Sequence, residues 1–183
     1  MANIPLEGKC KDRIENRKEQ IRNFFENLHY NKGIAEINND VGKINYYWSN
    51  YQISLEYYNK ALKIFNDIDD KKGQGLTFSN IGEIYYASKN FSKAIEFYLK
   101  ALSLTQKFGD KKDIANLYNQ LGNVFYYKNE FDTALIYYYD ALKIHEEYDN
   151  KKGIAFEYNN IGLVLIDLKK YSESIDYFEK SLK

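Results

Sequence analysis

The feature of this chain that most constrains its fold is a repeat with a period of forty residues. Glycine recurs at this step, and aromatic, small and leucine positions recur with it, without a gap. The rows are Gly42, Gly82, Gly122 and Gly162; Tyr51, Phe91, Phe131 and Tyr171; Ser54, Ala94, Ala134 and Ser174; Tyr58, Tyr98, Tyr138 and Phe178; Ala61, Ala101, Ala141 and Ser181; and Leu62, Leu102, Leu142 and Leu182. This period predicts stacked copies of one unit, because a single unit cannot bury both of its faces.

Each unit contains two helical patterns joined by a short polar turn. In the second unit, one apolar stripe runs from Phe78 to Tyr85 and another from Phe91 to Leu102, both with the spacing of a helix face. The glycine and alanine rows let neighbouring helices approach closely, and the aromatic rows fill the space between them. The sequence therefore predicts an all-α protein without a sheet: a right-handed α-solenoid of stacked helix-turn-helix units.

The repeat also predicts how the chain is organised. We expect a disordered lead over residues 1–10, a capping helix over residues 11–31 and four units over residues 32–183. The units span residues 32–70, 71–110, 111–150 and 151–183, and we expect the last one to be truncated. An uncapped last unit would expose apolar surface. This favours a fragment of a longer chain, while an end covered by a partner or by a second copy through self-association stays open.

These rows resemble the signature of the tetratricopeptide repeat (TPR) family over residues 33–183, through Gly82, Tyr85, Phe91, Ala94, Tyr98 and Ala101. The usual unit has about 34 residues and ends its second helix with proline. Here those places hold Asn66, Gln106 and Glu146, so the second helix can continue and the unit lengthens. The longer form is similar to the repeats of kinesin light chain, the Pins-type polarity adaptors and bacterial signalling proteins. The first unit departs from the pattern, since Asn38 and Asn45 replace aromatic residues.

Composition argues against several classes of partner. Lys and Arg number 26, as do Asp and Glu, and this neutral balance argues against nucleic acid binding, which needs a basic surface. No apolar run of about 18 residues is present, so we expect no membrane span. The start lacks the pattern of a secretory signal, and a single cysteine, Cys10, cannot form an internal disulfide. We therefore expect a cytoplasmic protein.

The sequence offers no set of residues for catalysis. His29 and His145 are the only histidines, and neither has a cysteine or second histidine at ligand spacing. No glycine-rich loop precedes Lys-Ser or Lys-Thr, as a phosphate site would need. Paired acids such as Asp69 and Asp70 fall at turns between units, where solvated helix ends explain them. We expect no enzyme activity, no cofactor and no metal.

The candidate binding surface follows from the resemblance, which implies that the first helix of each unit lines the concave side. Beside the core stripe, an amide row would run through Asn80, Gln120 and Asn160, and a tyrosine row through Tyr46, Tyr86 and Tyr126. An Asn or Gln side chain offers a donor and an acceptor to a bound peptide backbone, and tyrosine suits recognition surfaces. The resemblance implies such an asparagine ladder. The alternative is that the amides only face water and the tyrosines pack along their own helices. The predicted peptide-binding residues are Asp40, Lys43, Tyr46, Asn80, Glu83, Tyr86, Gln120, Asn123, Tyr126, Tyr127, Asn160 and Leu163.

Two functions fit these features. The first is an interaction module that holds a peptide or protein segment in its concave groove, where Lys43 and Glu83 would favour a ligand of mixed charge. The second is a sensor or regulatory segment of a larger signalling protein, such as a bacterial histidine kinase or diguanylate cyclase. A peptide-pheromone receptor is a third reading, which would need a further helical domain. An appended catalytic domain in the full-length gene would favour the second.

Overall fold

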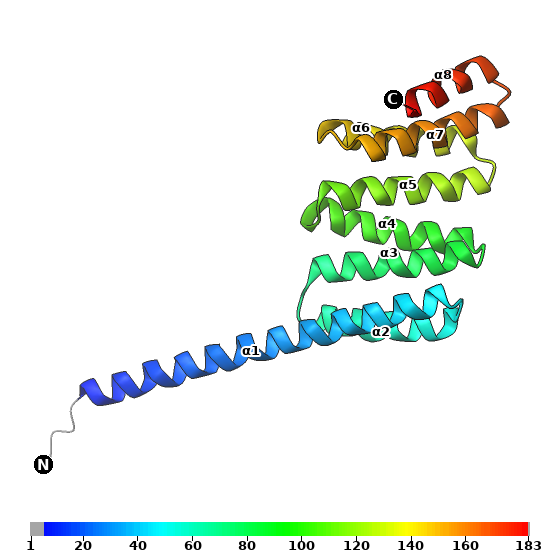
Figure 1. Cartoon of the computed structure of the whole chain (residues 1–183). Coiled ribbons are helices and arrows are strands. Elements are labelled where there is room, and N and C mark those ends of the chain that lie inside the picture. The colour runs from blue at the N-terminus through cyan, green and yellow to red at the C-terminus, as the bar shows by residue number, and fades with distance from the viewer. Residues whose placement is uncertain (1–5, 183) are drawn as a thin grey trace, which may run out of the picture.

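The structure is a computed structural model that describes the backbone of residues 6–182; side chains are described from residue 16 onward, apart from residues 18, 19, 21, 22 and 25. Over this range the chain forms helices and no strand: α1 (Leu6–Tyr47), α2 (Tyr51–Asp67), α3 (Lys71–Ala87), α4 (Phe91–Phe108), α5 (Lys111–Tyr127), α6 (Phe131–Glu147), α7 (Lys151–Asp167) and α8 (Tyr171–Ser181). Consecutive helices pack in pairs, and the pairs stack into one array (Figure 1). The predicted all-α repeat solenoid is confirmed.

Helix α1 differs from the predicted organisation. The sequence predicts a separate capping helix over residues 11–31, whereas the structure continues that helix without a break to Tyr47. The part before Gly33 extends beyond the array instead of covering its first unit (Figure 1). In agreement with this, Tyr30 is 70% exposed. The predicted disordered lead lies outside the described residues up to residue 5, and residues 6–10 belong to α1. The segment around Gly33 contains no proline, and glycine inside a helix costs only about 1 kcal/mol.

The second helix of each of the first three units is long because no proline ends it. No proline stands at Asn66, Gln106 or Glu146, so α2 continues through the first of these positions, α4 through the second and α6 through the third. Their small and aromatic rows make the core. Ala61, Ala101 and Ala141 are fully buried, and Tyr58, Tyr98 and Tyr138 are at most 2% exposed. Each of these tyrosines lies against a glycine of the preceding helix, where a side chain would collide with the ring.

All but one of the turns between consecutive helices share one backbone conformation. Six turn residues have φ between 52° and 61°, in the left-handed region: Ser49, Asp69, Lys89, Asn129, Asp149 and Lys169. The following N–H then bonds a carbonyl in the last helical turn, as Asn90 N does with Tyr85 O at 2.8 Å. Gly109 is the C-cap of α4 as its sequence position suggests, but its φ is −103°. Glycine is needed there for space, because a β-carbon would lie 2.5 Å from Cγ2 of Thr105.

No helix of the described chain has the length and apolar character that a membrane span would require.

Candidate functional site

The first helices of the units line one face of the array and are joined to one another by side-chain hydrogen bonds. Asn39 on α1 donates to Thr77 on α3 at 3.0 Å, and Ser79 on α3 donates to Gln120 on α5 at 3.1 Å. Helix α5 is linked to α7 in the same way, by bonds from Asn119 to Glu157. These contacts hold helices α1, α3, α5 and α7 side by side, so their exposed residues form a continuous surface.

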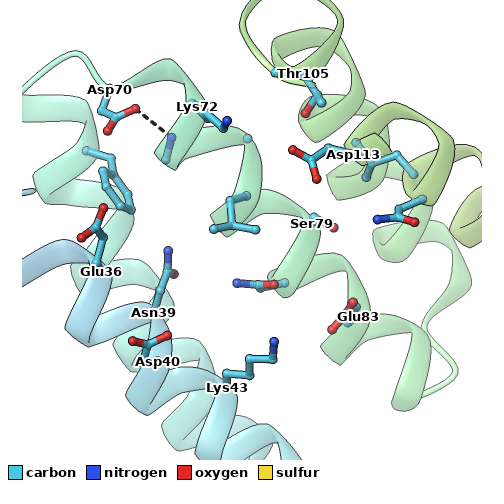
Figure 2. A pocket seen from close by; sticks show the side chains of 18 of the residues that line it. Glu36, Asn39, Asp40, Lys43, Asp70, Lys72, Ser79, Glu83, Thr105 and Asp113 are labelled. Atoms are coloured by element: carbon cyan, nitrogen blue, oxygen red, sulfur yellow. Dashed lines mark hydrogen bonds between the residues drawn. The ribbon is translucent and has the colours of Figure 1, made fainter. Parts of the chain in front are cut away.

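The larger cavity on this surface has a volume of about 600 Å³ and lies between α1, α3 and α5. Five of the predicted binding residues line it: Asp40, Lys43, Asn80, Glu83 and Gln120. In Figure 2, Asp40 and Lys43 come from α1, and Glu83 comes from α3 on the opposite side. The cavity also reaches the start of α3, where Asp70 accepts the N–H of Gly73 at 2.9 Å (Figure 2).

Acidic side chains outnumber basic ones in this cavity. Its charged lining consists of Lys32, Lys43, Lys72, Glu36, Asp40, Asp70, Glu83 and Asp113. Two of the lysines are already paired: Lys32 lies 3.0 Å from Asp70 and Lys72 lies 2.8 Å from Asp110. The ion pairs of the described residues include none to Glu36, Asp40 or Asp113. A positively charged ligand would therefore meet unpaired carboxylates here.

The smaller cavity, which we call the tyrosine pocket, has a volume of about 260 Å³. Its lining consists of Tyr86, Asn123, Tyr126, Tyr127, Tyr138, Asn160 and Leu163. All of these except Tyr138 are predicted binding residues. The ring centroids of Tyr86 and Tyr127 are 5.8 Å apart, and those of Tyr126 and Tyr127 are 5.5 Å apart. Burial raises the pKa of Tyr86 to about 12, so the ring stays uncharged at neutral pH.

Tyr46 is the one predicted binding residue that lines neither cavity. Its ring packs against Tyr51, with centroids 5.9 Å apart, and against Tyr47, with centroids 5.7 Å apart. This is the packing role that the sequence left open as an alternative for the tyrosine row. The row is therefore split, because Tyr86 and Tyr126 line the tyrosine pocket while Tyr46 packs within the first unit.

The amide row is split as well. Gln120 donates to Glu83 at 2.8 Å and accepts from Ser79, so both ends of its amide are used. Asn123 donates to Asn119 at 3.1 Å and accepts the Tyr138 hydroxyl at 2.8 Å. These amides hold helices together, which sequence reasoning did not anticipate. Asn80 makes no side-chain hydrogen bond with any described residue, so its donor and acceptor face the larger cavity unused.

A buried polar cluster behind the tyrosine pocket was also missed. Glu157 is 1% exposed and accepts from Asn119 at 2.9 and 3.0 Å and from Asn160 at 3.4 Å. Burial raises the pKa of Glu157 to about 7, although the two amides oppose this shift. Nε2 of His145 lies 4.0 Å from its Oε1, and burial lowers the pKa of His145. The sequence contained one signal for this cluster. The forty-residue step aligns Glu157 with Ile37, Thr77 and Leu117, so a charged residue stands at a position where the other units have uncharged ones.

The described residues contain no group of three or more His, Cys, Asp or Glu side chains that could hold a metal ion.

Comparison with known families adds a sequence match to this geometry. Residues 33–107, 73–147 and 113–183 each match the family model described as tetratricopeptide repeat. None of the curated proteins matches the sequence.

Several solved structures share the fold. BtubC (BKLC) from P. vanneervenii is 20% identical with a TM-score of 0.72, over 80% of this chain and 61% of that one. The apo form of RapI is 22% identical with a TM-score of 0.75, over 82% of this chain and 42% of that one. Aspartyl phosphate phosphatase F from Bacillus subtilis is 16% identical with a TM-score of 0.74, over 92% of this chain and 43% of that one. The chain thus spans less than two thirds of each of these structures.

Proposed function

Since the chain belongs to the tetratricopeptide repeat family, we propose that it is a non-catalytic interaction module that binds a peptide or an extended protein segment along its first-helix face. Repeats of this family typically serve as interaction modules. The proposal includes the cytoplasmic location that the sequence favours.

The observation that carries this proposal is that the two cavities are lined by neighbouring turns of the same two helices, α3 and α5. Glu83 and Gln120 line the larger cavity, while Tyr86 and Asn123 line the tyrosine pocket. Within each helix these residues are three apart, about one turn. The cavities therefore adjoin along both α3 and α5. An extended chain could contact the carboxylates of one cavity and the rings of the other.

A photo-crosslinking experiment tests this proposal. p-Benzoylphenylalanine placed at Asn80 or Asn116, which line the larger cavity, should capture a partner in cells of the source organism. The same label at Lys63, exposed on α2, should not capture that partner. Labels that react equally well at all three positions, or only at Lys63, would place the binding surface elsewhere.

Asn116, like Asn80, makes no side-chain hydrogen bond with a described residue, so a titration with the captured partner then measures the contribution of these two free amides. The double variant Asn80→Ala, Asn116→Ala should weaken binding by about tenfold or more, since two donor–acceptor pairs are removed. Asn59→Ala on α2 is the matched control, because Asn59 is an exposed amide of a second helix. Asn160 is unsuited to this test, since it is 9% exposed and donates to the buried Glu157.

A regulatory segment of a larger signalling protein remains the second candidate function. It is supported by the fold shared with RapI and aspartyl phosphate phosphatase F, of which this chain spans 42% and 43%. Reading the complete gene tests it, since a catalytic or second helical domain joined to residues 33–183 is expected.

Self-association through α8 is part of the proposal too. Leu182 is 87% exposed, whereas Leu102 and Leu142 at the same repeat position are 8% and 7% exposed under the next helix. Sedimentation velocity of this chain and of Leu182→Lys is the test: a dimer that the substitution disrupts is expected.

A further inference from the structure

The buried carboxylate behind the tyrosine pocket has no counterpart in the other units, although Thr77 and Asn39 form an uncharged hydrogen-bonded pair at the equivalent places. At the repeat positions of Glu157 the chain has Ile37, Thr77 and Leu117. At those of His145 it has Phe65 and Thr105. Apolar or small uncharged residues therefore satisfy the packing at this place in the solenoid. A buried carboxylate in the fourth unit needs a reason other than the fold, because burying an uncompensated charge is unfavourable.

Hydrogen bonds connect Glu157 to the lining of the tyrosine pocket. Asn160, which lines the pocket, donates to Glu157 directly. Asn119 donates to both carboxylate oxygens, and its own oxygen accepts from Asn123. Asn123 in turn accepts the hydroxyl of Tyr138 at 2.8 Å, and both of these residues line the pocket. The carboxylate therefore lies directly behind the polar part of the pocket wall.

No positive charge within the described structure compensates this carboxylate. Among the described residues, no lysine or arginine forms an ion pair with Glu157. His145 faces it from α6, but burial lowers the pKa of the imidazole. Nδ1 of His145 lies 2.8 Å from the Tyr148 hydroxyl and 3.1 Å from Nδ2 of Asn150, so these two residues hold the imidazole ring in place. Tyr138, also on α6, is the other titratable group that interacts electrostatically with Glu157, and burial raises its pKa.

The rest of the pocket favours a cation as well. The faces of Tyr86, Tyr126 and Tyr127 can attract a positive charge through their ring quadrupoles. A hydrogen bond with Asp167 raises the pKa of Tyr126 to about 12, so a second carboxylate acts on the pocket. The amide of Asn123 already makes one hydrogen bond from its nitrogen and one to its oxygen. A volume of about 260 Å³ suits one large side chain rather than a whole small molecule.

From this arrangement we infer that the tyrosine pocket receives a positively charged side chain of the bound peptide, with Glu157 as its buried counter-charge. An arginine fits better than a lysine, because its planar guanidinium stacks on aromatic rings. An apolar anchor would seal the carboxylate in the interior without compensation. The inference rests on the proposed function and names the chemistry of the partner at one position.

The test begins with a library of random dodecapeptides displayed on phage and selected against the whole chain at pH 8. The enriched peptides should share an arginine. Synthetic copies, acetylated and amidated, are then compared with copies in which citrulline replaces that arginine, by calorimetric titration. Citrulline keeps the shape and removes the charge, and it should lower the affinity by about tenfold or more.

Variants of the protein assign the effect to the pocket. Glu157→Gln should remove most of the difference between the arginine and citrulline peptides, and Glu56→Gln, at an exposed carboxylate of α2, should leave it intact. Tyr127→Ala, at a side chain that is 60% exposed, should weaken the arginine peptide without unfolding the array. Affinity for the arginine peptide should fall several-fold from pH 8 to pH 6, as Glu157 takes up a proton, and Glu157→Gln should abolish this fall.

The outcomes separate the two proposals. Failure to enrich any peptide would overturn both the groove function and the cation pocket. Peptides that bind the first-helix face but share an apolar anchor, with Glu157→Gln unchanged, would overturn the pocket inference alone. A pH dependence that persists in Glu157→Gln would assign the titration to His145 and would also overturn it.

Discussion

Gly122 on α5 lies so close to the ring of Tyr138 on α6 that a β-carbon at this glycine would stand 2.6 Å from Cε1 of the tyrosine. Gly42 and Tyr58 share this relationship at 2.5 Å, and Gly82 and Tyr98 share it at 2.6 Å. In the fourth unit, Gly162 faces Phe178 at 2.8 Å. The glycine and aromatic rows of the sequence are therefore the two halves of one contact, repeated in every helix pair.

This contact predicts that Gly122→Ala is destabilising. The ring of Tyr138 is 2% exposed and its hydroxyl is bonded to Asn123, so the ring cannot move aside cheaply. We expect a loss of about 1–3 kcal/mol in the free energy of unfolding, measured by urea denaturation. Gly33→Ala on α1 is the matched control, because a β-carbon there would meet nothing within 4 Å. That change should stabilise by up to about 1 kcal/mol, and equal losses in the two variants would contradict the packing.

The buried carboxylate of Glu157 predicts how stability depends on pH. Its pKa is about 7 in the folded protein and near 4.5 when exposed, so the folded state holds the proton more tightly. Its contribution to stability is fully present below about pH 4.5 and is lost as the pH rises through about 7. The loss should be on the order of 3 kcal/mol. In urea denaturation at several pH values, the free energy of unfolding of Glu157→Gln should fall less between pH 4.5 and 7 than that of the unaltered protein. Equal falls in the two proteins would refute the assignment.

In the row formed by Ser54, Ala94, Ala134 and Ser174, we expect serine and alanine to replace each other with little loss of stability. Ser54 donates to the carbonyl of Gly42 at 2.7 Å, and Ser174 donates to that of Gly162 at 2.9 Å. Ala94 holds the same place in the second unit without a hydroxyl and is fully buried. Ser54→Ala should therefore cost no more than about 1.5 kcal/mol, and Ala94→Ser should be similarly mild. Ala94→Val is the contrasting variant, and its melting temperature should fall clearly below that of Ala94→Ser.

The two kinds of amide should behave differently when truncated. Gln120→Ala removes bonds to Ser79 and Glu83 and should lower the free energy of unfolding by about 0.5–1.5 kcal/mol. Asn80→Ala removes no bond to a described side chain and should change it by less than about 0.5 kcal/mol. Comparing the free energies of unfolding of the two variants, measured by thermal denaturation, tests whether Gln120 is a structural amide and Asn80 a free one. A larger loss for Asn80→Ala would reverse the assignment.

The sequence was sufficient for the repeated core, because a forty-residue step in small and aromatic residues determines which side chains meet. Gly122 and Tyr138 belong to different rows of the same period, and both rows face the interior of one helix pair. The path of α1 was harder to predict. The turns between units and the segment before Gly33 use similar residues, and whether the chain turns there depends on whether a preceding second helix is available to pack against.

The sequence was enough to name most of the residues that line the two cavities, but not the hydrogen bonds among them. Eleven of the predicted residues line the two cavities, because repeat position alone decides which side of a first helix is exposed. Whether an amide is free depends on its neighbour on the next first helix. Asn39 meets Thr77 and Asn119 meets Glu157, both 38 residues apart. That offset is set by the tilt between stacked units, which the period of the sequence does not specify.

The N-terminal part of α1 projects from the array as a straight helical segment, which we call the arm (Figure 1). The residues from Leu6 to Lys32 precede the first helix pair within one unbroken helix. At about 1.5 Å per residue this segment is roughly 40 Å long. A tilt of about 10° in the first pair, caused by a peptide settling between α1 and α3, would swing the far end of the arm by roughly 7 Å over that length. A small rearrangement at the groove would thus be magnified into a displacement that a distance probe on the arm can record.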